Sequence, residues 1–235
     1  MEVSCKKNVY SVRKTYRRVN EYYRIFSALP SSDYEEVVAY LRKELSFYLT
    51  EQYESQFENA DVRHFNDNVN RNYMLYFDCT DDYSTDIYSR AARVVFIFAK
   101  SALNASKRNA YRLRRYAGSF KGIPQLDGYD KGHFVAHCND GQLDQNIYPQ
   151  LKELNRGLSA QGKLFRTMER YCQNNPGVFY FIRPIYSDLT CIPDKIDFGI
   201  FTKQCGLLLN RFDNRTMGIE PPQSMFNFDN SIKDN

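Results

Sequence analysis

The distribution of glycine and proline changes abruptly near residue 115, and this change constrains the fold more than any other feature of the sequence. After Tyr116, six such residues follow within a short span: Gly118, Gly122, Pro124, Gly128, Gly132 and Gly141. Helix interiors do not tolerate this density, because glycine loses much conformational freedom there and proline cannot donate the helical hydrogen bond. We therefore expect helices before this point and a mixture of strands and helices after it.

Three segments before residue 115 are predicted to be helical. Residues 10–28 carry apolar side chains at roughly helical spacing and are followed by Pro30. Ser32 and Glu35 form a capping box, so the next helix is expected to begin there and to run to about Phe57. A third helix is expected to begin around Asp86, with a buried stripe formed by Val94, Val95, Ile97, Phe98 and Leu103.

The second part of the chain is predicted to contain strands, a helix near Glu153–Asn174, and two further β-like runs at 178–182 and 196–201. Pro221-Pro222 is expected to end the ordered fold. The predicted fold class is α+β. We expect a helical N-terminal region of unknown role over residues 1–115, a second domain over 116–220 and a polar tail over 221–235.

The charge of the chain indicates a mild preference for anionic partners. Its 235 residues carry a formal net charge of +4, and the basic residues cluster at 13–18 and 107–115. Such clusters can neutralise phosphates, although each cluster alone is more typical of a solvated helix face. No apolar run approaches the ~20 residues of a membrane span, and Met1–Tyr10 lacks the apolar core of a signal peptide. We expect a protein that is cytoplasmic or delivered by a specialised secretion route, with no membrane partner.

The residues that could carry chemistry gather between positions 130 and 169. The segment Asp130-Lys131-Gly132-His133 is followed by the side chains of Asn146, Gln150, Asn155 and Glu169. A histidine with an ordinary pKa of ~6.5 can accept a proton from water at neutral pH. Amide oxygens are hard ligands that suit magnesium, which keeps several waters and uses few protein ligands. A base and one sparsely held cation are sufficient for phosphodiester hydrolysis, although Asn and Gln are also common in loops.

The order and spacing of these residues resemble those of the DNA/RNA non-specific endonucleases, the ββα-metal or His-Me finger nucleases that carry an Asp-Arg-Gly-His motif. Asn146-x-x-Pro-Gln150 and Leu-Asn155-x-Gly follow in the family's order, with Asn155 nine positions after Asn146. The resemblance covers about Asp127 to Gly177 and extends to Phe201, but not residues 1–115. It implies a ββα-metal core with antiparallel strands over 116–220. It also implies a divalent cofactor, Mg²⁺ or another such as Mn²⁺, and cleavage of DNA, and of RNA too, without sequence specificity.

The resemblance also implies a role for each matching position. His133 corresponds to the general base, and Asn155 to the direct metal ligand. Glu169 would order metal-bound water, and Asp130 would hold the turn that presents His133. Two amides would position the base, the substrate or the metal waters: Asn146 and Gln150.

Three departures from the family pattern bear on these roles. Lys131 replaces the arginine of the motif, which keeps the charge but loses bidentate phosphate geometry. The stretch from Asn155 to Glu169 is longer than usual. Gln173 stands where the family tends to have arginine, and Arg166 or Arg170 is the candidate to supply that charge to the substrate, although neither is in register.

Several alternatives remain open from the sequence. His133 and His137, with Cys138 beside them, allow a zinc site, although no fourth ligand follows at finger-like spacing. Cys138 could be a nucleophile if a histidine lowered its pKa. The main alternative function is a nucleic-acid-binding protein of the same fold that has lost hydrolysis. A nuclease of this kind could also serve as a toxin, effector or defence enzyme with a protein inhibitor or immunity partner.

Overall fold

The computed structural model describes residues 22, 25, 28–30, 33–56, 68–69, 73–79, 92–102, 128–143, 146–186, 192–202 and 206–215. Both basic clusters, Ser32 and the predicted tail over 221–235 lie outside these residues, as does most of the predicted helix over 10–28. None of the described helices is long and apolar enough to cross a membrane.

In the described part of the chain, eight strands form two antiparallel sheets. The larger sheet has the order β1-β2-β3-β6-β7-β8, and the smaller one pairs β4 with β5. The strands of the larger sheet are β1 (Asn68–Val69), β2 (Tyr73–Cys79), β3 (Ala92–Lys100), β6 (Phe179–Ile185), β7 (Lys195–Thr202) and β8 (Gly206–Asp213). Those of the smaller sheet are β4 (Tyr129–His133) and β5 (Ile147–Leu151), and the helices are α3 (Tyr34–Gln56), the 3-10 turn η3 (His137–Asn139), α5 (Lys152–Arg156) and α6 (Ala160–Asn174).

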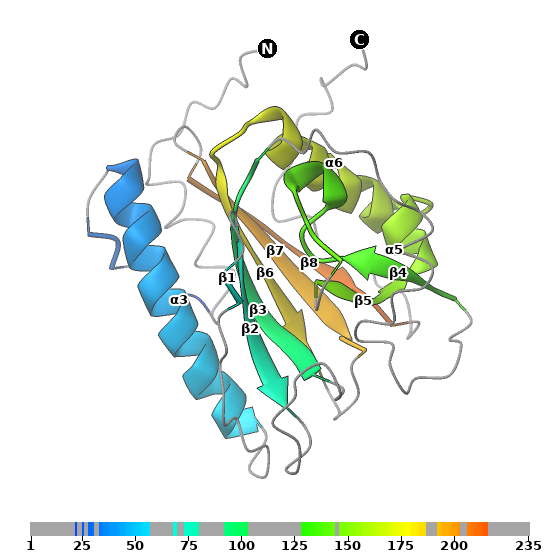
Figure 1. Cartoon of the computed structure of the whole chain (residues 1–235), viewed down its shortest axis with the longest axis horizontal. Coiled ribbons are helices and arrows are strands. Elements are labelled where there is room, and N and C mark those ends of the chain that lie inside the picture. Colours follow the sequence, from blue (N-terminus) through cyan, green and yellow to red (C-terminus); the bar gives the residue numbers. More distant parts are fainter. Residues whose placement is uncertain are drawn as a thin grey trace.

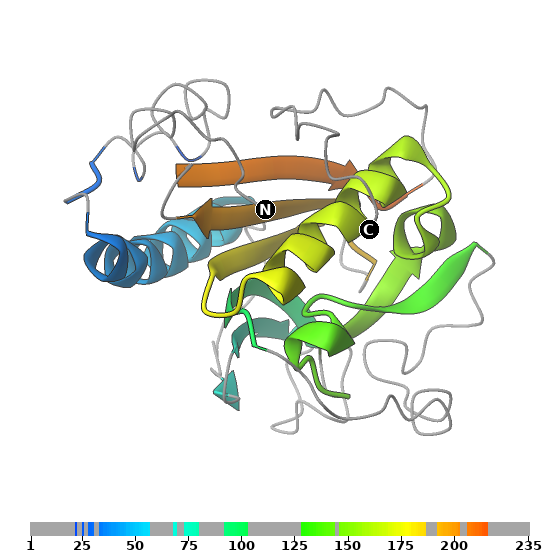
Figure 2. The same cartoon turned by 90° about the horizontal axis from the view of Figure 1, so that it is seen from above.

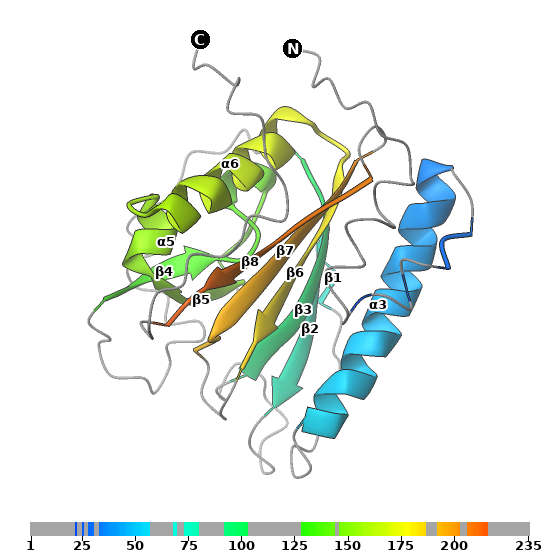
Figure 3. The ribbon, with the colours of Figure 1, turned by 180° about the vertical axis from the view of Figure 1, so that it is seen from behind.

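The two faces of the larger sheet have different covers. The long helix α3 lies along one face, whereas β4, β5, α5 and α6 lie on the other (Figures 1 and 3). Seen from above, α5 lies at the N-terminal end of α6, with β4 and β5 beside them (Figure 2). The predicted α+β class with antiparallel strands is confirmed, and the succession β4-β5-α5 is the expected ββα order.

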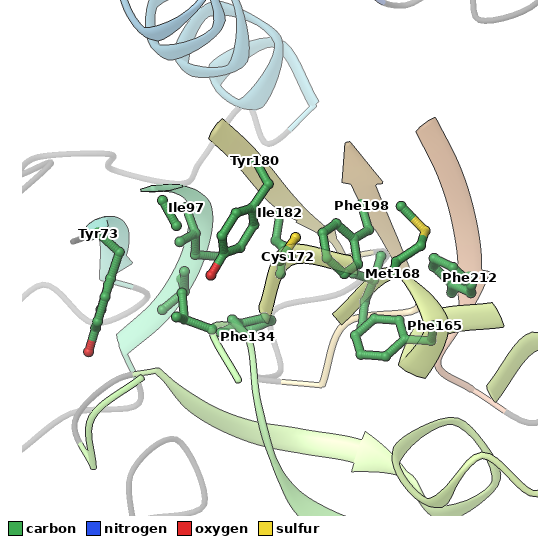
Figure 4. Close-up of a cluster of buried hydrophobic side chains, with 14 of the residues drawn as sticks. Tyr73, Ile97, Phe134, Phe165, Met168, Cys172, Tyr180, Ile182, Phe198 and Phe212 are labelled. Atoms are coloured by element: carbon green, nitrogen blue, oxygen red, sulfur yellow. The ribbon is translucent and has the colours of Figure 1, made fainter. Parts of the chain in front are cut away.

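Each face of the larger sheet has its own apolar core, because side chains alternate between the faces of a strand. Under α3 the sheet contributes aromatic rings, among them Phe96, Phe98, Phe179 and Phe181. On the opposite face, α6 contributes Phe165, Met168 and Cys172, which pack against side chains of the sheet (Figure 4). These sheet side chains include Tyr180, Ile182, Phe198 and Phe212.

The helix predicted from Asp86 is wrong: residues 92–100 form β3. This strand is buried on both faces, with Phe96 and Phe98 in the core under α3 and Val94 and Ile97 in the opposite core. A strand buried on both faces is a continuous apolar run without strict alternation, so its pattern can be mistaken for a buried helix. The prediction of a helical region over 1–115 therefore holds for α3 but not for the strands β1, β2 and β3. Because β3 pairs with β6, one sheet crosses the boundary predicted near residue 115.

The predicted helix after residue 32 is confirmed, but its cap is Asp33. The Oδ1 atom of Asp33 accepts hydrogen bonds from the backbone N–H groups of Glu35 and Glu36, each at 3.0 Å. An aspartate at this position satisfies N–H groups that have no partner within the helix.

The helix predicted over Glu153–Asn174 is interrupted. Gly157 ends α5 with a φ of 69°, a left-handed conformation that favours glycine. Ser159 then caps α6 by accepting a hydrogen bond from the backbone of Gly162 at 3.0 Å. A Cβ atom on Gly162 would lie 2.1 Å from the carbonyl oxygen of Glu153, so a glycine at this position allows the two helices to pack closely. The β-like runs at 178–182 and 196–201 are confirmed as parts of β6 and β7.

Candidate active site

His133 is the last residue of β4, and the neighbouring strand determines how it is held. In the antiparallel register, His133 is opposite Ile147 and Asp130 is opposite Gln150. A Cβ atom on Gly132 would lie 2.2 Å from Oε1 of Gln150, so the glycine of the motif leaves room for this buried glutamine. His133 itself is 7% exposed. The imidazole is thus largely buried and is held by a tightly packed pair of strands.

Asn146 fixes the segment that follows His133. Its Nδ2 group donates to the carbonyl oxygen of Val135 at 2.9 Å, and its Oδ1 atom accepts from the N–H of Val135 at 2.7 Å. Its own carbonyl oxygen accepts from the N–H of Phe134 at 3.0 Å. Asn146 and Gln150 are both buried and lie outside the lining of the cavity described below. The hydrogen bonds of Asn146 hold the backbone after His133, and Gln150 packs closely against Gly132 before it.

A cavity of about 320 Å³ brings together most of the residues singled out in the sequence. Its lining comes from β4, the segment 136–138, α5 and α6, and comprises His133, Ala136, His137, Cys138, Asn155, Arg166, Glu169, Arg170 and Gln173. The side chains predicted as base and metal ligand, His133 and Asn155, therefore lie at the same cavity. Lys131 and Asp130 are not part of the lining.

The side chain of Asn155 is oriented by a carboxylate. Its Nδ2 group donates to Oδ2 of Asp130 at 3.0 Å. The same carboxylate accepts two hydrogen bonds from Arg156, from Nε to Oδ2 and from Nη2 to Oδ1, both at 2.7 Å. The bonds from Arg156 are the largest cause of a lowered pKa of Asp130, so the group is ionised at neutral pH. Asp130 was predicted to hold the turn before His133, whereas its hydrogen bonds go to the helix that carries Asn155.

The helix α6 contributes the charges of the cavity. Two arginines, Arg166 and Arg170, are exposed at its edge, whereas Glu169 is half-buried. Arg166 also donates from Nη1 to the carbonyl oxygen of Asn155 at 3.2 Å. Gln173, which replaces an arginine of the family pattern, lines the same cavity. Both candidate replacement cations are therefore at the site, although neither occupies position 173.

Lys131, which replaces the arginine of the family motif, lies outside the lining of the cavity. It is half-buried, and burial lowers the pKa of its amino group. It lies two positions before His133 and so projects from the same side of β4. Its side chain is not among those that line the cavity.

The alternative chemistries receive no support from this geometry. Within the described part of the chain, no group of three or more His, Cys, Asp or Glu side chains is arranged to hold a metal ion. This argues against a zinc site built on His133, His137 and Cys138. Burial raises the pKa of the Cys138 thiol, and the nearby Glu169 raises it further. A thiol in this state is a poor nucleophile at neutral pH.

Arg156 was not identified from the sequence, although it contacts Asp130 next to the predicted metal ligand. Its ion pair with Asp130 joins residues 26 positions apart, and no local pattern marks it. Because β4 and α5 are brought together only by the fold, a basic residue next to the predicted metal ligand gave no signal of its own.

Comparisons with known proteins agree with the resemblance found in the sequence. The family model described as DNA/RNA non-specific endonuclease matches residues 67–203, which is more than half of the chain. No curated protein matches the sequence. Among solved structures, "Structure of Sda1 nuclease with bound zinc ion" matches at 12% identity and a TM-score of 0.40, covering 70% of this chain and 94% of that one. A second, "extracellular endonuclease", matches at 14% identity and a TM-score of 0.37, covering 71% and 88%. On the extent of the family match, the chain belongs to the DNA/RNA non-specific endonuclease family.

Proposed function

We propose that this protein is a divalent-metal-dependent endonuclease that hydrolyses phosphodiester bonds in DNA and RNA without sequence specificity. The observation that carries the proposal is the presence of His133 and Asn155 at one cavity, with the amide nitrogen of Asn155 bonded to Asp130. Since Nδ2 is committed to that carboxylate, the carbonyl oxygen Oδ1 is the atom that remains to face a ligand.

The donor atoms at the cavity fit a hard divalent cation. The amide oxygen of Asn155 would bind it directly, and the carboxylate of Glu169 would bind its waters. One direct oxygen ligand and one carboxylate that binds the metal's waters suit Mg²⁺ or Mn²⁺, which retain several waters in such sites. The chemistry that such an ion supplies is polarisation of a phosphoryl oxygen and stabilisation of the charge that develops on the leaving oxygen.

His133 would act as the general base. Its imidazole accepts a proton from a water molecule, and that water attacks phosphorus in line with the departing 3′ oxygen. The packing of β4 against β5 fixes the ring at the cavity, which lowers the cost of reaching a reactive arrangement. Because this step uses an external water and no 2′-hydroxyl, both DNA and RNA are substrates.

Arg166 and Arg170 would bind phosphates next to the scissile bond. Both guanidinium groups are exposed at the edge of the cavity, where a nucleic-acid backbone can reach them. Contacts to phosphate carry no sequence information, which accounts for cleavage without sequence preference.

The proposal is tested by nicking of a supercoiled plasmid, with RNA as a second substrate. We expect cleavage in magnesium, none in excess EDTA, and a loss of about 10²- to 10⁴-fold in His133→Ala, the range for removal of a general base. Circular dichroism of the variant checks that it is folded. Full activity in EDTA, or in folded His133→Ala, would contradict the proposal.

Cys138→Ser separates this chemistry from the thiol alternative. Because burial keeps the Cys138 thiol protonated, the serine variant should retain nearly all of the cleavage rate at neutral pH. A folded Cys138→Ser protein that cannot cleave would instead identify the thiol as the reactive group.

A second function, nucleic-acid binding without hydrolysis, is favoured by two departures from the family pattern, Lys131 and Gln173. It predicts binding of labelled duplex DNA in EDTA and no cleavage with any divalent metal. Metal-dependent cleavage that His133→Ala abolishes would exclude it.

We also propose a biological role as a toxin, effector or defence nuclease that is paired with an inhibitor protein. Its test is expression of the wild-type protein, and of His133→Ala for comparison, in cells that lack an inhibitor. Robust growth of cells that contain active enzyme would count against this role.

A further inference from the structure

The ion pair between Arg156 and Asp130 is hydrogen-bonded to the proposed metal ligand, Asn155. Three hydrogen bonds converge on one carboxylate: two from Arg156 at 2.7 Å and one from Asn155 at 3.0 Å. The carboxylate belongs to β4 and both donors belong to α5. The cluster therefore joins the strand that carries His133 to the helix that carries Asn155.

We infer that Arg156 is a positioning residue for the divalent metal site and acts through Asp130 on the amide of Asn155. The inference rests on the proposed function, because it assigns Asn155 as the metal ligand. Arg156 itself does not line the cavity, and its contact with the site is made through the carboxylate of Asp130.

The geometry explains why one hydrogen bond to Asn155 would not be sufficient. A single bond from Nδ2 leaves the carboxylate able to rotate about its own side chain. Two parallel bonds from a planar guanidinium fix the plane of the carboxylate, since this pairing is bidentate. With Asp130 fixed, the amide of Asn155 has one preferred orientation, in which Oδ1 is left for the cation.

The backbone of Asn155 is held as well. Arg166 donates to its carbonyl oxygen at 3.2 Å, and Gly157 closes α5 in a left-handed conformation two residues later. The main chain and the side chain of the ligand are thus held by different arginines. Loss of Arg156 should therefore loosen the amide without moving the helix.

Exposure separates this role from simple stabilisation. The side chain of Arg156 is 56% exposed, whereas that of Asp130 is 18% exposed. An ion pair with one partner this exposed contributes little to folding, as is typical at protein surfaces. Substitution of Arg156 should therefore leave the protein folded and change metal binding.

The test measures affinity for Mn²⁺ directly, by the loss of the electron paramagnetic resonance signal of the free ion on titration. The full-length protein is compared with Arg156→Gln, Arg156→Lys and Asn155→Ala. We expect Asn155→Ala to lose most of the affinity and Arg156→Gln to bind about five- to tenfold more weakly. Arg156→Lys should also bind weakly, because lysine keeps the charge but cannot form the parallel pair.

Lys100→Gln is the matched control. Lys100 forms an exposed ion pair with Glu35 at 3.2 Å, with a side chain 50% exposed, and neither residue lines the cavity. This variant should keep wild-type affinity for Mn²⁺. Thermal unfolding without metal should be similar for Arg156→Gln and Lys100→Gln.

Cleavage kinetics give the second readout. In Arg156→Gln the metal concentration required for half-maximal cleavage should rise by the same factor as the dissociation constant, and saturating metal should recover most of the maximal rate. Weak binding in Asn155→Ala with unchanged affinity in Arg156→Gln would overturn this inference alone. Unchanged affinity in Asn155→Ala would overturn the metal site of the proposed function, and the inference with it.

Discussion

Asp197 and Asp130 are each bound by two hydrogen bonds from one arginine, but Asp197 is buried whereas Asp130 lies next to the cavity. Asp197 accepts bonds from Arg211, Nε to Oδ1 at 2.6 Å and Nη2 to Oδ2 at 2.9 Å, and another from the hydroxyl of Tyr22. It is 1% exposed, and Arg183 lies 3.9 Å from Oδ2. Asp130 has the same bidentate arrangement with Arg156, but its third donor is the cavity-lining Asn155.

The difference shows that a cluster of charges does not by itself identify a functional site. Around Asp197 the acceptor atoms are used by the buried Tyr22 and the partly exposed Arg211. Tyr22 belongs to the apolar core under α3. Its hydrogen bond to Asp197 therefore joins residues that are far apart in the sequence to the larger sheet. Around Asp130, the cluster ends on a side chain that faces a cavity. The neighbouring cavity, and not the charges, connects Asp130 to the metal site that we propose.

The largest effect on stability is expected from Asp197→Ala. Removing this carboxylate takes away an ion-pair partner 3.9 Å from the buried Arg183 and the acceptor of the Tyr22 hydroxyl. Loss of one partner of a buried pair costs about 3–5 kcal/mol. Chemical denaturation should show this decrease in the free energy of unfolding. A decrease below about 1 kcal/mol would mean that the interactions of Asp197 stabilise the fold no more than those of Asp130 do.

Gly132→Ala should affect both stability and cleavage. A Cβ atom there would lie 2.4 Å from Cβ of Gln150, so the two strands that hold His133 must separate. Overpacking of this kind costs about 1–3 kcal/mol, and displacement of His133 should lower the cleavage rate at least tenfold.

Gly199→Ala is the control on the opposite face. Its Cβ atom would lie 2.3 Å from the ring of Phe181, in the core under α3. It should lower the free energy of unfolding by a similar amount while the cleavage rate, measured well below the unfolding temperature, stays near wild type. Equal loss of cleavage in both variants would show that the two faces are not functionally separate.

The smallest effect is expected from Asp33→Ala at the start of α3. The substitution removes the acceptor for two backbone N–H groups, each 3.0 Å from Oδ1. Loss of such a cap costs about 1 kcal/mol. Thermal unfolding should report this decrease, and cleavage and Mn²⁺ affinity should not change. A change in either would mean that α3 influences the site across the sheet.

Agreement between sequence and structure was best where the pattern is local. The helix α3, the strands β6 and β7 and the ββα order were predicted, because each depends on periodicity or on a short motif. The strand β3 was misassigned, since its two faces are both buried and its apolar residues show no alternation that excludes a helix. The strand β8 was not predicted, although it pairs with β7, which ends only a few residues before it.

For the site, the sequence alone determined which residue types were present and in what order: a histidine after Asp-Lys-Gly, and amides at the spacing of the family. Those identities require no knowledge of space. Only the tertiary structure decided which of them share the cavity, that Asn146 hydrogen-bonds the backbone that follows His133, and that Arg156 holds Asp130. The reason is physical: hydrogen bonds and cavity walls join residues from β4, α5 and α6 that are far apart along the chain, and sequence spacing carries no information about such distances.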